Sequence, residues 1–364
     1  MSCPPIFQIM KLLSPQNLIP FLLTALTFSN CSTYKISKSV VNNDYYNAFK
    51  LIPEASRMGF NSTPDSFLEW SLKKTLQEAE KAFKDRPVLS KLPKLRLHGM
   101  LTPYNFKIRD NYPIVFTRTE NSFDGNPVWD IISAEVSALM AAKYFRFDSY
   151  KRGSCLRAYQ SQMNGLMKKH QLPNLIIPSD LGGEALSEDQ KSSTPEIDPE
   201  LFATIKKAFS RDIVRRQSLP NPAHPEGEKI KLLRLDDESL WRLAPLPYLE
   251  SCSDFRKTLN LYSSKTKIHC IKNTLGKNFL LEEVNTSDRY FTLKDFVDSS
   301  QLEPIVNSMC NQIAFRHSLQ LSQEDRQKLF LLITKNPGLP GWYMNFVDKH
   351  SDEILDAYRA SLLL

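Results

Sequence analysis

The sequence lacks the features of several large protein classes. Residues 18–28 form an uncharged apolar run, but a membrane-spanning helix needs about 20 apolar residues, and no later run is longer. No repeat of fixed period is present, and no recognition helix or aromatic-rich RNA-binding signature occurs. The net charge of +7 is spread over 47 basic and 40 acidic residues, which favours a solvated surface over a nucleic-acid-binding patch. We therefore expect no nucleic-acid partner.

The six cysteines show no metal-binding pattern. None lies in a Cys-x-x-Cys pair or at metal-ligand spacing from a histidine, so the sequence does not predict a zinc site. If Cys3 is removed with a signal segment and Cys31 is lipidated, four remain: Cys155, Cys252, Cys270 and Cys310. An exported protein can pair such cysteines, but their spacing leaves the connectivity open.

The amino terminus has the pattern of a secretory signal. A charged start, the apolar run and small polar residues follow one another, and a start at Met10 makes the pattern more regular. The run ends near Cys31, which resembles the acylated cysteine of bacterial lipoproteins, although Phe28 and Asn30 replace the usual residues at minus three and minus one. The alternative is an ordinary cleaved signal. Acyl chains on Cys31 would hold the protein on a membrane surface, in the periplasm or outside the cell.

Hydrophobic patterning predicts a helix-rich α+β domain over residues 57–364, after a signal over 1–31 and a polar linker over 32–56. Residues 178–198 are rich in Gly, Ser and Pro and predict a flexible loop. Strand patterns occupy 94–98, 107–117 and several segments within 229–296, and helices are expected at 64–85, 128–145, 156–169, 201–217, 301–320, 322–334 and 341–363. The helix at 201–217 is basic and either contacts anionic lipid or forms a solvated face.

The segment HGMLTPYN, His98 to Asn105, has the spacing of a kinase-type catalytic loop. In such a loop an Asp accepts the proton of the attacking hydroxyl, and an Asn binds magnesium. His98, Gly99 and Asn105 are in place, but Met100 occupies the position of the Asp. Because a thioether cannot accept that proton, the sequence predicts that general-base catalysis is lost.

The position of the magnesium-binding Asp is also altered. The apolar strand after the loop leads to Thr117 instead of a carboxylate. Glu120 and Asp124 are the nearby acids that could replace it, and we take them as the only catalytic candidates. Asp130 opens the next helix and is expected to be a cap or a buried anchor. We expect no metal site.

Two further positions are candidate phosphate ligands. Gly276 lies in a predicted strand-turn-strand, where a phosphate loop would carry several glycines and an ordinary hairpin needs one. Lys294 lies in RYFTLKDF, an alternating segment predicted as a strand, as for the phosphate-binding lysine of kinases. The alternative for Lys294 is a solvated side chain.

Taken in this order, the segments resemble a bacterial kinase-like family catalogued as domain of unknown function twenty-two fifty-two. The resemblance covers residues 57–364 and includes STPDSFLEW, HGMLTPYN, NPVWD, LRAYQSQM and the carboxy-terminal helices, with His317 near the family histidine. It implies a two-lobed protein-kinase-like fold with a permuted order of elements. The departures fall on the proton acceptor, the metal-binding Asp, the early Arg and most loop glycines.

These patterns predict an exported, lipid-anchored pseudokinase that binds an unknown protein or an anionic ligand without a cofactor. His98, Asn105, Gly276 and Lys294 are the expected ligand-binding residues. The alternative is a divergent phosphotransferase or nucleotidyltransferase that uses ATP and magnesium with Lys294, Asn105 and a displaced carboxylate. A third possibility is a structural envelope lipoprotein whose cleft is filled by Met100 and Tyr104, the latter being the bulky residue before Asn105.

Overall fold

The chain divides into two compact units, Met1–Asn43 and Asp44–Leu364, and all described helices and strands lie in the second. The expected signal segment and Cys31 lie outside the described residues. The second unit combines helices with antiparallel sheets, which confirms the α+β class. This computed structural model describes residues 42–53, 64–109, 112–117, 121–168, 181, 184–185, 197–219, 230–246, 261–262, 267–273, 275–285 and 287–362.

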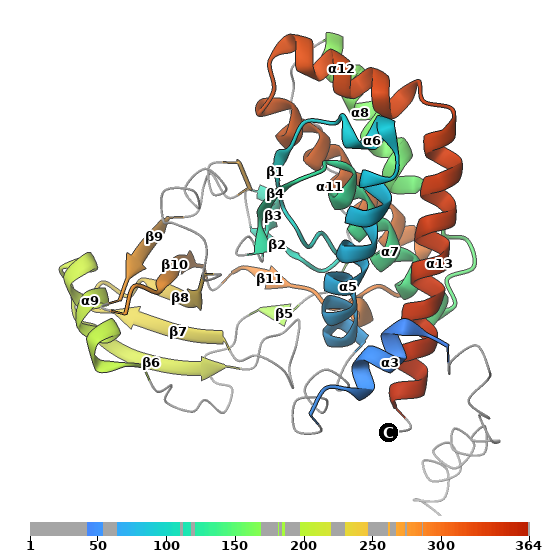
Figure 1. The fold of residues 1–364 in the computed structure, drawn as a ribbon. Helices are drawn as coiled ribbons and strands as arrows, with labels where there is room; N and C mark the ends of the chain where they lie inside the picture. The colour runs from blue at the N-terminus through green and yellow to red at the C-terminus, as the bar shows by residue number, and fades with distance from the viewer. Residues whose placement is uncertain are drawn as a thin grey trace, which may run out of the picture. The chain divides into compact units, whose positions relative to one another are not determined.

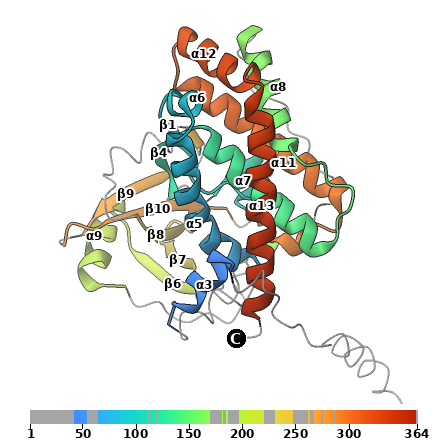
Figure 2. The ribbon, with the colours of Figure 1, turned by 45° about the vertical axis from the view of Figure 1, so that its right-hand side comes forward.

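The helices pack around α7 (Val128–Phe145), which is apolar on all sides and therefore buried along most of its length. Helices α8, α11 and α13 contact it, and α5 lies beside α13 (Figures 1 and 2). The predicted helices are confirmed, with ends that shift by up to three residues, as α5 (Pro64–Lys84), α8 (Ser154–Lys168), α11 (Ser299–Leu319), α12 (Gln323–Thr334) and α13 (Gly338–Ser361). A short helix, α6 (Pro87–Ser90), follows α5. None of the described helices has the length and apolar composition needed to cross a membrane.

Three antiparallel sheets accompany the helices. β1 (Leu95–Leu97) pairs with β4 (Phe123–Gly125). A four-stranded sheet has the order β3 (Tyr112–Phe116), β2 (Phe106–Arg109), β11 (Arg289–Tyr290) and β5 (Glu184–Ala185). A five-stranded sheet has the order β6 (Ile213–Leu219), β7 (Ile230–Leu235), β8 (Leu240–Pro245), β10 (Asn278–Val284) and β9 (Ile268–Lys272). The prediction of strands over 229–296 is thus confirmed, except near residue 294.

The basic helix predicted over 201–217 is too long. Helix α9 spans Pro199–Phe209, and the chain then continues as strand β6. Asp198 caps its first turn by accepting a hydrogen bond from the Glu200 backbone N–H at 2.8 Å. Ser210 has a φ of 52°, a left-handed conformation that ends the helix, and the β-branched pair Ile213 and Val214 favours the strand that follows. The apolar face of α9 packs on the five-stranded sheet through Leu201 and Ile205 (Figure 1).

The predicted linker over 32–56 contains a packed helix, α3 (Asp44–Lys50). Its aromatic residues explain the difference, because Tyr45 and Phe49 are buried. The Phe49 ring lies 5.1 Å from that of Phe67 in α5. The Tyr45 hydroxyl forms a hydrogen bond of 2.7 Å with Nδ1 of His350 in α13. Residues 44–50 are therefore part of the folded unit.

The contact between α3 and α13 predicts a loss of stability in acid. Burial, followed by the charge of Lys349, lowers the pKa of His350 from 6.5 to about 4. Glu353 Oε2 lies 3.6 Å from Nδ1, but Tyr45 occupies that nitrogen at the shorter distance. A group with a lowered folded pKa binds its proton more tightly when unfolded, so its stabilisation is complete above pH 6.5 and is lost as the pH falls through 4. The expected loss from His350 between pH 7 and pH 4 is about 3 kcal/mol.

Urea unfolding at a series of pH values measures this effect. The wild-type free energy of unfolding should fall more steeply below pH 6.5 than that of a His350→Gln variant. A His269→Gln variant is the comparison, because it removes a histidine of β9 outside the contact between α3 and α13; a change of slope confined to His350→Gln identifies that contact. Parallel curves for the wild type and His350→Gln would contradict the prediction.

Candidate functional site

The candidate site is the loop from His98 to Asn105, which connects β1 to β2. Gly99 has a φ of +87°, and a Cβ at this position would overlap the backbone carbonyl oxygen of Asn121. Both features require glycine. The Trp129 indole N–H donates a hydrogen bond of 2.7 Å to the Gly99 carbonyl, so α7 holds the turn from the other side. The turn at Gly99 is therefore constrained on both sides.

Asp130, in the first turn of α7, is the anchor of this loop. Its two carboxylate oxygens accept hydrogen bonds of 2.9 Å from the backbone N–H groups of His98 and Gly99. His317 in α11 places its Nε2 3.1 Å from Oδ2, and its Nδ1 lies 2.9 Å from the Tyr159 hydroxyl. The side chains of Asp130 and His317 have no solvent exposure. This arrangement gives Asp130 a structural role and links the loop to α7, α8 and α11.

The side chain of Asn105 holds the loop closed. Its amide N–H donates a hydrogen bond of 2.8 Å to the Met100 carbonyl oxygen, and Asn105 is 1% exposed. Met100 and Tyr104 are also buried, at 5% and 2% exposed. The Tyr104 hydroxyl donates to the backbone oxygen of Asp65 at 3.1 Å. Asn105 thus serves as an internal brace of the loop.

The residues expected near a metal ion are arranged differently. The backbone carbonyl oxygen of Thr117 lies 2.8 Å from Nε2 of His98. Asp124 lies on β4 with 69% of its side chain exposed and contacts Arg96 at 3.6 Å. Glu120 lies outside the described residues. Over the part of the chain that the structure describes, no three His, Cys, Asp or Glu side chains form a metal-binding group.

The two candidate phosphate ligands lie elsewhere. Gly276, with a φ of +80°, forms the turn of the hairpin between β9 and β10, where its N–H donates to the Asn273 carbonyl at 3.0 Å. Lys294 is exposed and belongs to a 3₁₀ turn, Leu293–Asp295, so the predicted strand at this position is wrong. The side chains of Thr292 and Asp295 cap that turn and thereby interrupt the alternating pattern. No interaction between described residues joins Gly276 or Lys294 to the loop.

A buried charge cluster was not predicted. It consists of Lys107, Glu282, Asp288 and Arg242. Lys107 Nζ lies 3.1 Å from Glu282 Oε1 and 2.9 Å from Asp288 Oδ2, and Arg242 lies 3.1 Å from Glu282. Burial would lower the pKa of Lys107, but the charges of Glu282 and Asp288 raise it. Burial likewise opposes the ionised form of Glu282, but Lys107 and Arg242 lower its pKa. The cluster joins β2, directly after the loop, to β8 and β10 of the five-stranded sheet.

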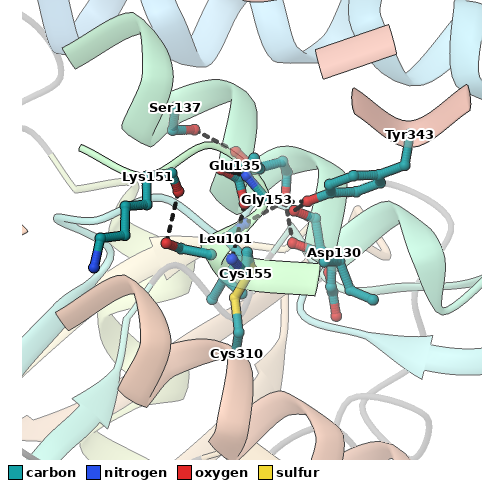
Figure 3. The surroundings of a disulfide bond; sticks show 12 residues. Leu101, Asp130, Glu135, Ser137, Lys151, Gly153, Cys155, Cys310 and Tyr343 are labelled. Carbon is teal, nitrogen blue, oxygen red and sulfur yellow. Dashed lines mark hydrogen bonds between the residues drawn. A yellow bond between two sulfur atoms is a disulfide. The ribbon is translucent and has the colours of Figure 1, made fainter. Parts of the chain in front are cut away.

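A second buried acid, Glu135, was also missed. Its carboxylate accepts backbone hydrogen bonds of 2.8 Å from both Gly153 and Cys155 and a hydrogen bond of 3.4 Å from the Tyr343 hydroxyl (Figure 3). The Tyr150 hydroxyl donates to the same carboxylate at 3.3 Å. Burial raises the pKa of Glu135. Glu135 thus fixes the turn between α7 and α8. An acid in the middle of a helix whose neighbouring positions are mostly apolar was the sequence signal for such an anchor.

A disulfide joins Cys155 in α8 to Cys310 in α11, next to Glu135 (Figure 3). The two Cα atoms are 5.5 Å apart, and both residues are fully buried. Cys270 in β9 is disulfide-bonded as well. Cys252 lies outside the described residues. The pairing that the sequence left open is therefore settled for Cys155 and Cys310.

Comparison with known proteins gives no relative from which a function can be transferred. No family model, no curated protein and no solved structure matches the chain. The chemistry must therefore be argued from the residues themselves. The loop offers a buried amide, a buried thioether and an imidazole whose Nε2 is directed at a backbone carbonyl.

Proposed function

We propose that this chain is an exported, lipid-anchored, kinase-like protein that acts as a binding or scaffolding module and does not transfer phosphoryl groups. The observation that carries the proposal is the hydrogen bond from the Asn105 amide to the Met100 carbonyl oxygen. This bond directs the Asn105 amide into the loop, and Asn105 is 1% exposed, so its side chain does not line an open cleft. Met100, at the position of the proton acceptor, is itself buried.

The arrangement of the five-stranded sheet supports the kinase-like part of the proposal. In protein kinases the phosphate-binding lysine lies on the third strand. The third strand of this sheet along the chain is β8, whose cation is Arg242. Arg242 is paired with Glu282 at 3.1 Å, so its charge is balanced inside the protein.

The disulfides support export. Such bonds persist in oxidising compartments and are rare in the cytosol of most organisms. Cys155, Cys310 and Cys270 all participate in them. A signal segment that ends at Cys31 would deliver the chain to such a compartment and hold it on a membrane surface.

Cell fractionation with a Cys31→Ser variant tests the anchor. We expect the wild type in the membrane fraction and the variant in the soluble exported fraction, because the variant cannot be acylated. Cys270→Ser serves as the control, because it removes a cysteine of the folded unit and should leave the protein on the membrane. An unchanged distribution of Cys31→Ser would refute the lipid anchor.

A specific observation favours a second candidate, a structural envelope lipoprotein with a filled cleft. Met100 and Tyr104 are both buried, as this alternative requires. The divergent-enzyme alternative has less support. It needs a displaced carboxylate, and Asp124 is largely exposed and paired with Arg96. The binding and structural candidates differ in one respect: only the first requires a ligand site outside the loop.

A further inference from the structure

An arginine near the loop carries a positive charge that no carboxylate of the described residues balances. Arg316 lies in the last turn of α11, directly before His317. Its Nε is buried and has no hydrogen-bond partner. Among the described residues, no carboxylate forms an ion pair with its guanidinium. The guanidinium carbon lies 6.0 Å from the ring centroid of Phe315. A partly buried, uncompensated cation is costly, so an anion is expected to accompany it.

The surroundings of Arg316 add positive charge. Tyr262 is buried and donates a hydrogen bond of 2.8 Å to the backbone oxygen of Arg96. The charges of both Arg316 and Arg96 lower the pKa of Tyr262 against the larger effect of burial, which raises it. Two guanidinium groups therefore act on one phenol. Arg96 contacts the exposed Asp124 at 3.6 Å.

The position is held rigidly. The Gln320 side chain accepts from the Arg96 backbone N–H at 2.7 Å and donates to the Arg96 carbonyl at 3.0 Å. These bonds tie the end of α11 to β1. His317, one residue after Arg316, is fixed on Asp130. The nearby buried acid, Asp130, is already engaged by two backbone N–H groups as well as His317.

We propose that Arg316, with Tyr262 and Arg96 beside it, forms a binding site for a small oxyanion, such as a phosphate or carboxylate group. A guanidinium matches both groups because its two Nη groups can donate to two oxygens at once, while the buried Nε faces the protein. The site lies outside the loop from His98 to Asn105. It gives the chemical class of the ligand for the binding role proposed above, and this inference rests on that role. An arginine at a helix end also complements the helix dipole, a role that needs no ligand.

Thermal unfolding of the full chain measures the site. The probes are inorganic phosphate, glycerol 3-phosphate and acetate, each compared with chloride at equal ionic strength. We expect at least one oxyanion to raise the unfolding midpoint of the wild type in a saturable way. Glycerol 3-phosphate stands for a lipid head group, so its effect relative to inorganic phosphate and acetate identifies the source.

Variants separate ligand binding from helix stabilisation. Arg316→Met should weaken the oxyanion response at least tenfold and, without the anion, should be as stable as the wild type or more stable. Arg316→Lys keeps the charge but loses the planar fork, so it should also respond at least tenfold more weakly. Arg359→Met, an exposed arginine of α13, is the control with the same charge change and should respond as the wild type does.

Three outcomes would overturn the site: no oxyanion exceeds chloride, Arg316→Met keeps the full response, or Arg316→Met is less stable than the wild type without any anion. None of these outcomes would contradict the proposed absence of phosphoryl transfer, because that proposal is argued from Met100 and Asn105. Conversely, detection of phosphotransfer would remove the proposed function while the oxyanion response could still be measured at Arg316.

Discussion

Replacing Lys107 by methionine is expected to lower the free energy of unfolding by about 3–5 kcal/mol. The substitution removes the ammonium group from between Glu282 and Asp288, which lie 3.1 and 2.9 Å away. These carboxylates are buried, so water cannot replace the lost partner. Breaking one side of a buried ion pair leaves an uncompensated charge, and this penalty exceeds any gain from the apolar replacement.

Lys267→Met is the matched control for this prediction. Lys267 pairs with Glu283 at 3.0 Å, and Glu283 follows Glu282 in strand β10. The Lys267 side chain, however, is 74% exposed. An exposed pair of this kind contributes about 0–1 kcal/mol. Equilibrium urea unfolding of the two variants measures the difference. Equal losses for Lys107→Met and Lys267→Met would show that the buried charge cluster does not stabilise the connection between β2 and the five-stranded sheet.

Removing the Cys155–Cys310 disulfide should have an effect of similar size. The two cysteines are separated by 155 positions, and cross-linking a loop of this length restricts the unfolded chain by about 5 kcal/mol in the chain-entropy treatment. Measured losses for native disulfides are about 2–5 kcal/mol. We expect the double variant Cys155→Ser, Cys310→Ser to lose stability in this range.

The comparison must account for the other disulfide, at Cys270. Urea unfolding is therefore measured with and without a reductant for the wild type, for the double variant and for Cys270→Ser. The reductant should destabilise Cys270→Ser strongly and the double variant less. If the double variant unfolds within 0.5 kcal/mol of the wild type under oxidising conditions, which is about the effect of an ordinary surface substitution, the cross-link does not stabilise the fold.

Local sequence signals predicted the helices well. The segment 128–145 is apolar on all sides, and α7 has the predicted ends. The helix at 64–85 was predicted from its first-turn proline and its apolar face, and α5 differs by one residue. In both segments the signal lies within neighbouring residues. The loop at 98–105 was also found, because its spacing is local.

Interactions between distant residues could not be predicted. Lys107 and Glu282 are 175 positions apart, and each looks like an ordinary charged residue in a strand. Lys294 was placed on a strand because its segment alternates, but the capping residues on either side start a 3₁₀ turn. The use of Asn105 as a brace depends on the folded path of the loop. Gly276 and Lys294 were expected near the loop at 98–105 because of the family resemblance. No interaction between described residues connects either of them to that loop.

The central claim is that the loop keeps the framework of a nucleotide-binding site while Asn105 and Met100 close it against a metal-bound nucleotide. Calorimetric titration of the full chain with ATP, with and without Mg²⁺, tests this claim most directly. We predict no Mg²⁺-dependent binding; any weak binding of ATP phosphates at Arg316 should persist without Mg²⁺ and should be lost in Arg316→Met. Binding of ATP that requires Mg²⁺ and is abolished by Asn105→Ala would contradict the account.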